Sequence, residues 1–225
     1  MGRMRHSGPM KSVGGFEIGA AASGWTAETN TTAVDSSGNL YQAGTQITAT
    51  AAELNAAADN SAQAALVTPS AVITATAASI QTSVVRTGDI IKTMMVIDIT
   101  GLKSSTTDLD IIGDTGVCYI GRVTTAINGV VFAGQMGCAI VPTTGADDID
   151  LYSATEATGA YDAGVAALTE TALVTAGGAH AIGTVKPFTA VPAANQYLYL
   201  TGGEGGTAGT YDAGTLIIEM WGTVA

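Results

Sequence analysis

Apolar and polar residues alternate along residues 91–100, and this is the clearest structural pattern in the chain. Ile91, Met95, Ile97 and Ile99 stand at odd positions, with only Thr93 interrupting the row, and three of the five even positions are polar. Successive side chains of a strand point to opposite faces of a sheet. The segment is therefore predicted to be a strand with one buried face.

Seven further segments combine apolar or β-branched residues with flanking turn clusters. They are 117–123, 129–141, 149–152, 172–174, 181–188, 197–201 and 215–222. The Asn128-Gly129 pair lies between two apolar runs, which predicts a tight hairpin. Strands in this number, with no convincing helix between them, predict a mainly β fold: an antiparallel, jelly-roll-like β-sandwich over residues 89–225.

Residues 1–43 sustain neither a period of two nor a period of 3.6. Isolated apolar residues stand among Gly, Ser and Thr, which predicts an extended N-terminal arm without a core of its own. Each of these apolar residues can bury in a groove of a partner while the chain between them stays extended.

Residues 44–88 carry helix signals and are predicted to form a short helical linker or docking segment. Thr50 and Glu53 have the spacing of a capping box, and the residues after Thr50 are mostly helix formers. This helix is either an ordinary capped linker helix or an element that orders against a neighbouring subunit. A second start at Thr68-Pro69 leads into Ala71–Val85, where β-branched residues make helix and strand compete, and helix is preferred.

The charge of the chain is low in amount and uneven in position. Charged residues make up 12% of the chain, against about 25% in a typical globular protein. The formal net charge is −11, and residues 93–225 hold thirteen acidic and three basic residues. Nucleic acids and anionic membranes are bound mainly through Lys and Arg, so neither is expected as a partner.

The sequence shows neither a signal peptide nor a membrane-spanning segment. The basic stretch Met1–Lys11 is followed by Gly and Glu residues rather than by an apolar run. No window reaches the eighteen or so apolar residues of a transmembrane helix. The expectation is a protein made in the cytoplasm and kept there or assembled there into a particle.

Residues suited to catalysis are scarce. His6 and His180 are the only histidines, and His180 has no acid or obvious nucleophile near it in the sequence. Neither a nucleophile-elbow motif nor a phosphate-binding loop is present. We therefore expect no enzymatic activity and no cofactor. Cys118 and Cys138 fall among apolar positions of predicted strands, which predicts buried free thiols.

Two clusters of acidic residues are the one feature of the sequence that raises the question of a metal site. Calcium takes six to eight oxygen ligands, but neither cluster follows the EF-hand order, and solvated loop carboxylates are the preferred interpretation. No metal is expected; if a calcium site exists, the second cluster is the candidate. The clusters are Asp108, Asp110 and Asp114, and Asp147, Asp148 and Asp150.

The segment Ile47–Asn55, ITATAAELN, resembles a short element of structural proteins in tailed-bacteriophage virions, where it occurs in fibres and head-associated proteins. Ile73–Ile80, ITATAASI, repeats the first part of this element. Two copies suit an arm that makes the same kind of contact twice.

The resemblance implies a virion structural protein that is assembled in the host cytoplasm. The leading hypothesis is a capsid decoration or cement protein, a homotrimer whose arm cross-links subunits of the major capsid protein. The alternative is a head or tail fibre, or receptor-binding protein, attached by the same arm. The expected partner-binding residues are Phe16, Ile18, Trp25, Leu40, Ile47, Leu54, Ile73 and Ile80.

Overall fold

The computed structural model describes residues 32–34, 40–42, 45–46, 69–70, 73, 77–175, 177–204 and 206–224. The chain divides into two compact units, Met1–Ala58 and Asp59–Ala225. Each unit is taken by itself below.

The first unit contains a small antiparallel sheet. Its strands β1 (Thr32–Val34), β2 (Leu40–Gln42) and β3 (Thr45–Gln46) follow one another in space in chain order. In the register, Tyr41 of β2 pairs with both Ala33 and Gln46. The pairing of β2 with β3 crosses the boundary predicted between residues 43 and 44, so part of the predicted arm is strand.

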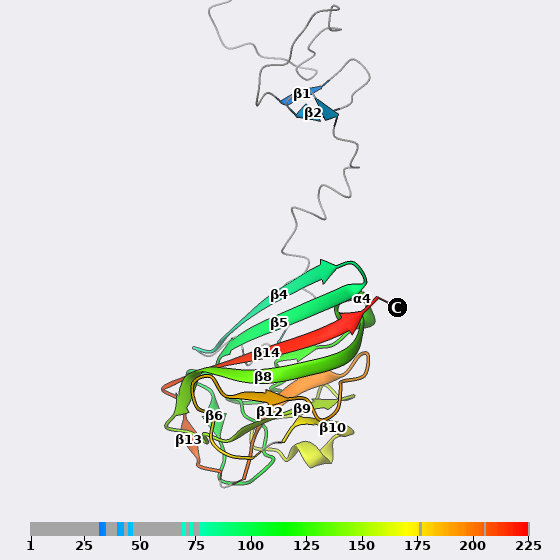
Figure 1. The fold of residues 1–225 in the computed structure, drawn as a ribbon. Helices are drawn as coiled ribbons and strands as arrows, with labels where there is room; N and C mark the ends of the chain where they lie inside the picture. Colours follow the sequence, from blue (N-terminus) through cyan, green and yellow to red (C-terminus); the bar gives the residue numbers. More distant parts are fainter. Residues whose placement is uncertain are drawn as a thin grey trace, which may run out of the picture. The chain divides into compact units, whose positions relative to one another are not determined.

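The second unit is built on a five-stranded antiparallel sheet of order β11-β8-β14-β5-β4 (Figure 1). The last strand of the chain, β14, lies at its centre and pairs along its length with both β8 and β5. The strands are β4 (Ser79–Thr87), β5 (Ile90–Asp98), β8 (Val130–Thr143), β11 (Val185–Pro187) and β14 (Ala213–Thr223).

The alternation in β5 and β14 decides which face of this sheet is buried. Every second residue of β14, including Leu216, Ile218 and Met220, is buried, while the residues between them are partly exposed. Ile218 pairs with Met95 of β5 and with Met136 of β8. Residues that face each other across a pair lie on the same side of the sheet, so these apolar rows form one continuous inner face.

A second antiparallel sheet has four strands in the order β10-β9-β12-β7. Its central strand β9 is buried at every position, without alternation. Figure 1 shows β9, β10 and β12 lying beneath the five-stranded sheet. The strands are β7 (Gly121–Arg122), β9 (Ile149–Ala154), β10 (Glu170–Val174) and β12 (Tyr197–Gly202).

The hydrophobic core draws on both sheets. Met95 and Ile218 of the five-stranded sheet share one buried cluster with Leu151 and Leu200 of the four-stranded sheet. The smaller elements lie in the connections. They are β6 (Lys103–Ser104) paired with β13 (Gly209–Thr210), the short helix α4 (Thr125–Asn128) and the 3-10 turn η1 (Val165–Ala167).

The prediction of a helix over 71–85 is wrong from Ser79 onward. Ile73 is helical, but Ser79–Thr87 forms β4 and pairs with β5 residue by residue, from Ser79 with Asp98 to Thr87 with Ile90. The β-branched residues of this segment suit a pleated sheet, and a ladder to β5 satisfies the backbone. The β domain therefore begins before the predicted residue 89.

The hairpin predicted at Asn128-Gly129 is also wrong. Asn128 ends α4, and its buried side chain accepts a hydrogen bond from the Thr124 N–H (2.8 Å) and donates one to the Thr93 hydroxyl (2.9 Å). Gly129 follows with φ of 67°. The strands on either side, β7 and β8, belong to different sheets. The pair caps a helix turn that changes sheets, rather than joining two neighbouring strands.

The mainly β, antiparallel prediction is confirmed, and each segment predicted as a strand contains strand residues. The jelly-roll-like sandwich stays a prediction. Cys118 and Cys138 are both buried and free, as expected. In the part of the chain that the structure describes, no helix is long and apolar enough to cross a membrane.

Candidate functional site

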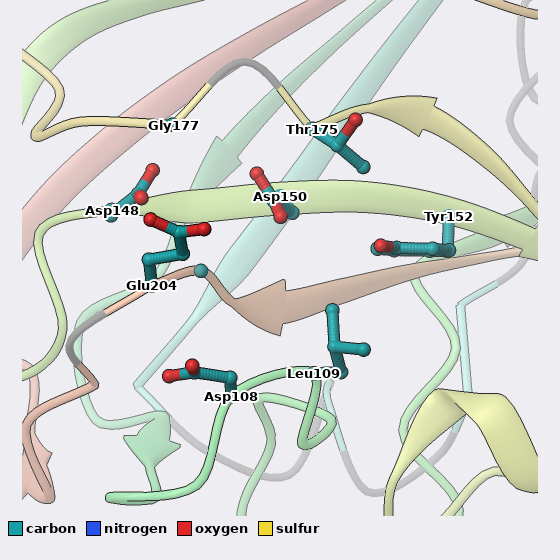
Figure 2. Close-up of a pocket in the computed structure, with 9 residues that line it drawn as sticks. Asp108, Leu109, Asp148, Asp150, Tyr152, Thr175, Gly177 and Glu204 are labelled. Atoms are coloured by element: carbon teal, nitrogen blue, oxygen red, sulfur yellow. The ribbon is translucent and has the colours of Figure 1, made fainter.

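An acidic cavity of about 410 Å³ lies beside β9 (Figure 2). The 203–204 loop is anchored to its rim by a hydrogen bond from the Gly203 N–H to the Asp148 carbonyl (2.9 Å). The opposite rim is tied to β12, because the Leu109 N–H donates to the Gly202 carbonyl (2.9 Å). The lining residues are Asp108, Leu109, Asp148, Asp150, Tyr152, Thr175, Gly177, Gly203 and Glu204.

Asp148 lies at one end of the cavity, and its carboxylate forms an ion pair with the buried ammonium group of Lys186. Lys186 Nζ lies 3.1 Å from Asp148 Oδ1, and both side chains are 7% exposed. The same Nζ donates to the Gly178 carbonyl (2.8 Å), and the Gly178 N–H donates to Asp148 Oδ2 (2.9 Å). Both carboxylate oxygens of Asp148 are thus occupied. A Cβ at Gly203 would lie 2.6 Å from this carboxylate, so only glycine lets the loop approach it this closely.

Asp150, two residues further along β9, has no such partner. Its residue is 6% exposed, and its buried Oδ1 has no hydrogen-bond partner among the described residues. Burial, the neighbouring Asp148 and Glu204 raise its pKa, while Lys186 opposes them, and the result is a pKa of about 6. Successive side chains of a strand alternate in direction, so Asp150 and Tyr152 of β9 lie on the same side of the sheet. They line the cavity together with Asp148, which immediately precedes the strand (Figure 2).

His180 lies behind the same end of β9 and is almost completely buried, at 1% exposed. Its Nε2 donates to the Ile149 carbonyl (2.8 Å), and its backbone N–H donates to the Asp147 carbonyl (2.8 Å). Burial lowers its pKa, which favours the neutral ring. His180 lies in the connection between β10 and β11, and its hydrogen bonds support β9 from within the domain.

The three residues of the second acidic cluster are separated by the fold. Asp147 is exposed and does not line the cavity, Asp148 is held by Lys186, and Asp150 faces the cavity. Among the residues described, no group of three His, Cys, Asp or Glu side chains is arranged to hold a metal ion.

The first acidic cluster is dispersed as well. Asp110 accepts a hydrogen bond from the Ser105 hydroxyl (2.9 Å), and Asp114 forms an ion pair with Lys103 (2.6 Å). Asp108 alone reaches the cavity. Its Oδ1 lies 3.5 Å from the Gly206 backbone nitrogen.

Lys186, Tyr152 and Glu204 were not singled out from the sequence. Lys186 is one of only three basic residues in residues 93–225, and it stands within a predicted strand. A lone lysine in such a strand is a signal that could have suggested a buried carboxylate partner. Its partner could not be identified, because Asp148 is 38 residues away along the chain.

The outer face of the five-stranded sheet is a second candidate surface. It is the face turned away from the core, and it exposes Val85, Val130, Phe132, Ile140 and Val185, each more than half exposed. Between them lies a hollow of about 230 Å³, whose lining includes Met94, Ile217 and Glu219. Glu219 is paired with Lys92 (2.5 Å) and accepts a hydrogen bond from Gln135 (2.6 Å).

The predicted partner-binding residues fall in several environments. Phe16, Ile18, Trp25, Ile47 and Leu54 lie outside the described residues. Leu40 begins β2, and its side chain is also outside the description. Ile73 is fully buried in the core of its own unit, and Ile80 packs partly buried against that core from β4.

Comparison with protein-family models, with curated proteins and with solved structures finds no match to this chain.

Proposed function

We propose that this chain is a structural protein of a tailed-bacteriophage virion, acting as a decoration or cement protein on the capsid. In this role it works without catalysis. Its partners are the major capsid protein and further copies of itself, arranged as a homotrimer. The finer architecture that we propose for residues 89–225 is the jelly-roll-like sandwich, and the assembly site is the host cytoplasm.

The observation that carries the proposal is the apolar outer face of the five-stranded sheet. Monomeric proteins rarely expose a large continuous apolar patch, and such patches mark interaction surfaces. Here exposed apolar side chains lie on the adjacent strands β8 and β11, with Phe132 and Val185, and on the edge strand β4, with Val85. The Lys92–Glu219 ion pair lies between them, on β5 and β14. A surface of this kind supports a protein that functions packed against neighbours.

The edge strand β4 adds to this support. It lies at one end of the strand order, so along one side no other strand of the described residues pairs with it. It is nine residues long, and Arg86 is its only charged residue. Proteins usually shorten or charge such edges; a long, nearly uncharged edge suits strand addition by a partner.

The virion setting rests on the resemblance of Ile47–Asn55 to an element of phage structural proteins. Under this proposal the N-terminal segment attaches the protein to the capsid, and the acidic β domain lies on the outside of the particle. The cross-links between subunits would resist the internal pressure of the packaged DNA.

The test is the copy number of this protein in purified virions, measured by quantitative mass spectrometry against the major capsid protein. A ratio of the same order as the capsid subunit is expected for a decoration protein. A handful of copies per particle would overturn the decoration role and favour the fibre or receptor-binding alternative. Absence from purified particles would overturn the virion setting altogether.

A further inference from the structure

The cavity beside β9 concentrates negative charge. Four of its nine described lining residues are acidic, and none of the nine is basic. Figure 2 shows the carboxylates of Asp148 and Glu204 near one another, Asp150 between Asp148 and Tyr152, and Asp108 apart from them near Leu109. Nearby carboxylates repel one another, so a cation entering the cavity is attracted by all of them.

Asp150 is the buried carboxylate of this cavity that forms no ion pair among the described residues. A buried carboxylate is costly unless it is paired or hydrogen-bonded, yet the buried Oδ1 of Asp150 has no partner among the described residues. Directly across the sheet, Thr201 pairs with Asp150 in the β9–β12 register. The hydroxyl of Thr201 is also buried without a partner. Two unpartnered oxygens therefore lie on neighbouring strands: Asp150 lines the cavity, and Thr201 is fully buried next to it.

The neighbouring residue Asp148 shows which chemical group satisfies such a carboxylate. At Asp148, the ammonium group of Lys186 bonds both to the carboxylate and to the Gly178 carbonyl. An ammonium carries three N–H donors and a guanidinium five, and these suit a mixture of carboxylate and neutral oxygens. Around Asp150 the oxygens are of the same two kinds, since Asp150 and Glu204 are carboxylates and Thr201 is a hydroxyl.

We propose that this cavity binds a cationic nitrogen group, an ammonium or a guanidinium, which pairs with Asp150. The group is carried either by a free amine or by a Lys or Arg side chain of a protein partner. Glu204 and Asp108 add charge at the rim. Tyr152 lines the cavity, and its ring attracts cations of this kind. This inference is independent of the proposed virion role.

The geometry favours such a group over a metal ion. Calcium takes six to eight oxygen ligands at 2.3–2.6 Å, whereas both oxygens of Asp148 are already engaged by Lys186 and the Gly178 N–H. The volume of about 410 Å³ is also far larger than a bare ion fills. It accommodates the end of a long side chain or a small amine.

The experiment is a titration of the full, ¹⁵N-labelled chain at pH 7.5 with three probes: agmatine, the peptide acetyl-Gly-Arg-Gly-amide and CaCl₂. We expect agmatine or the peptide to shift the amide signals of Thr175, Gly177 and Gly203, which border the cavity. Shifts with agmatine alone assign the site to free amines, and shifts with the peptide assign it to a partner side chain.

Three variants make the test specific. Asp150→Asn keeps the shape of the side chain and removes its charge, so the affinity should fall by about tenfold or more. Asp147→Asn makes the same charge change at an exposed neighbour outside the cavity, and we expect less than about a twofold effect there. Glu204→Gln, on the exposed rim, gives an intermediate loss without a risk to folding.

Three results would overturn the inference. Neither organic probe shifts the cavity amides at millimolar concentration; or Asp147→Asn weakens binding as much as Asp150→Asn, which indicates only a diffuse field; or calcium binds more tightly than both, in an Asp150-dependent way, which indicates a metal site.

Discussion

The two sheets of the second unit place apolar and ionisable residues in opposite ways. The five-stranded sheet exposes Phe132 and Val85 on its outer face. The four-stranded sheet buries Asp150 on β9 and Asp148 just before it, next to the loop that carries Leu109. One sheet thus leaves apolar side chains exposed on its outer face, and the other encloses charged side chains.

This difference shows that whether a strand position is buried does not follow from whether its residue is polar. Strand β14 alternates between buried and partly exposed positions, whereas β9 is buried throughout. The ionisable groups of β9 are therefore enclosed within the domain, whereas the outer face of the other sheet exposes apolar side chains, which our proposal assigns to association with other subunits. Changes on the two sheets should accordingly affect different observables.

The largest effect is expected from Lys186→Met. Removal of one partner of a buried ion pair leaves the other charge uncompensated, which costs about 3–5 kcal/mol. Urea unfolding at pH 7 should show this loss of unfolding free energy. The double variant Lys186→Met/Asp148→Asn should recover a large part of it. A single variant as stable as the parent would show that the pair contributes nothing to the stability of the four-stranded sheet.

The next effect has the opposite sign and depends on pH. The folded-state pKa of Asp150, about 6, lies above its ordinary value of 3.8, so the folded protein binds this proton more tightly than the unfolded chain. The stabilisation is fully present below about pH 4 and is lost as pH rises to about 6. Asp150→Asn should therefore raise the unfolding free energy at pH 7 by up to about 3 kcal/mol.

The same variant should have a much smaller effect at pH 4, where the parent carboxyl is protonated in the folded state and about half protonated in the unfolded state. The measurement is urea unfolding at several pH values, with Asp147→Asn as the control for a lost surface charge. The charged groups that set this pKa are Asp148, Glu204 and Lys186. A gain for Asp150→Asn that is equal at pH 4 and pH 7 would contradict the titration.

A smaller loss is expected on the five-stranded sheet from Asn128→Ala. The substitution leaves the Thr124 N–H and the Thr93 hydroxyl without their partner, which costs about 1–3 kcal/mol because Thr93 is buried. Thermal and urea unfolding measure it. Adding Thr93→Val removes the hydroxyl that Asn128→Ala leaves unpaired, so the double variant should lose less unfolding free energy than the single variant. A double variant no more stable than the single one would refute this account of the polar pair.

The smallest effect on stability is expected from Phe132→Ser. This side chain is 54% exposed, so the unfolding free energy should change by about 0.5 kcal/mol or less. Self-association should nevertheless weaken, as measured by light scattering after size-exclusion chromatography. Val191→Ser, at an exposed loop valine, is the matched control. If Phe132→Ser leaves self-association unchanged, the outer face is not the surface through which copies of the protein associate.

The sequence by itself determined those strands whose alternating pattern does not depend on which strand pairs with them. Alternation in 91–100 and in 215–222 reports one buried face whatever lies opposite, and both segments are strands in the structure. The buried thiols of Cys118 and Cys138 followed from the same reasoning. These features depend on local burial, which a period of two encodes directly.

Tertiary structure alone decided the features that depend on a distant partner. The sequence pattern predicts a helix for residues 79–85. In the structure these residues form a strand, because pairing with β5 provides hydrogen-bond partners for their backbone. Asn128-Gly129 matched a hairpin, yet the flanking strands pair in different sheets. Asp150 on β9 and Asp148 just before it have the same side chain, and the position of Lys186 makes one paired and the other open. The physical reason is that a side chain's neighbours across a sheet are set by which strands pair, and that choice is made by the whole chain.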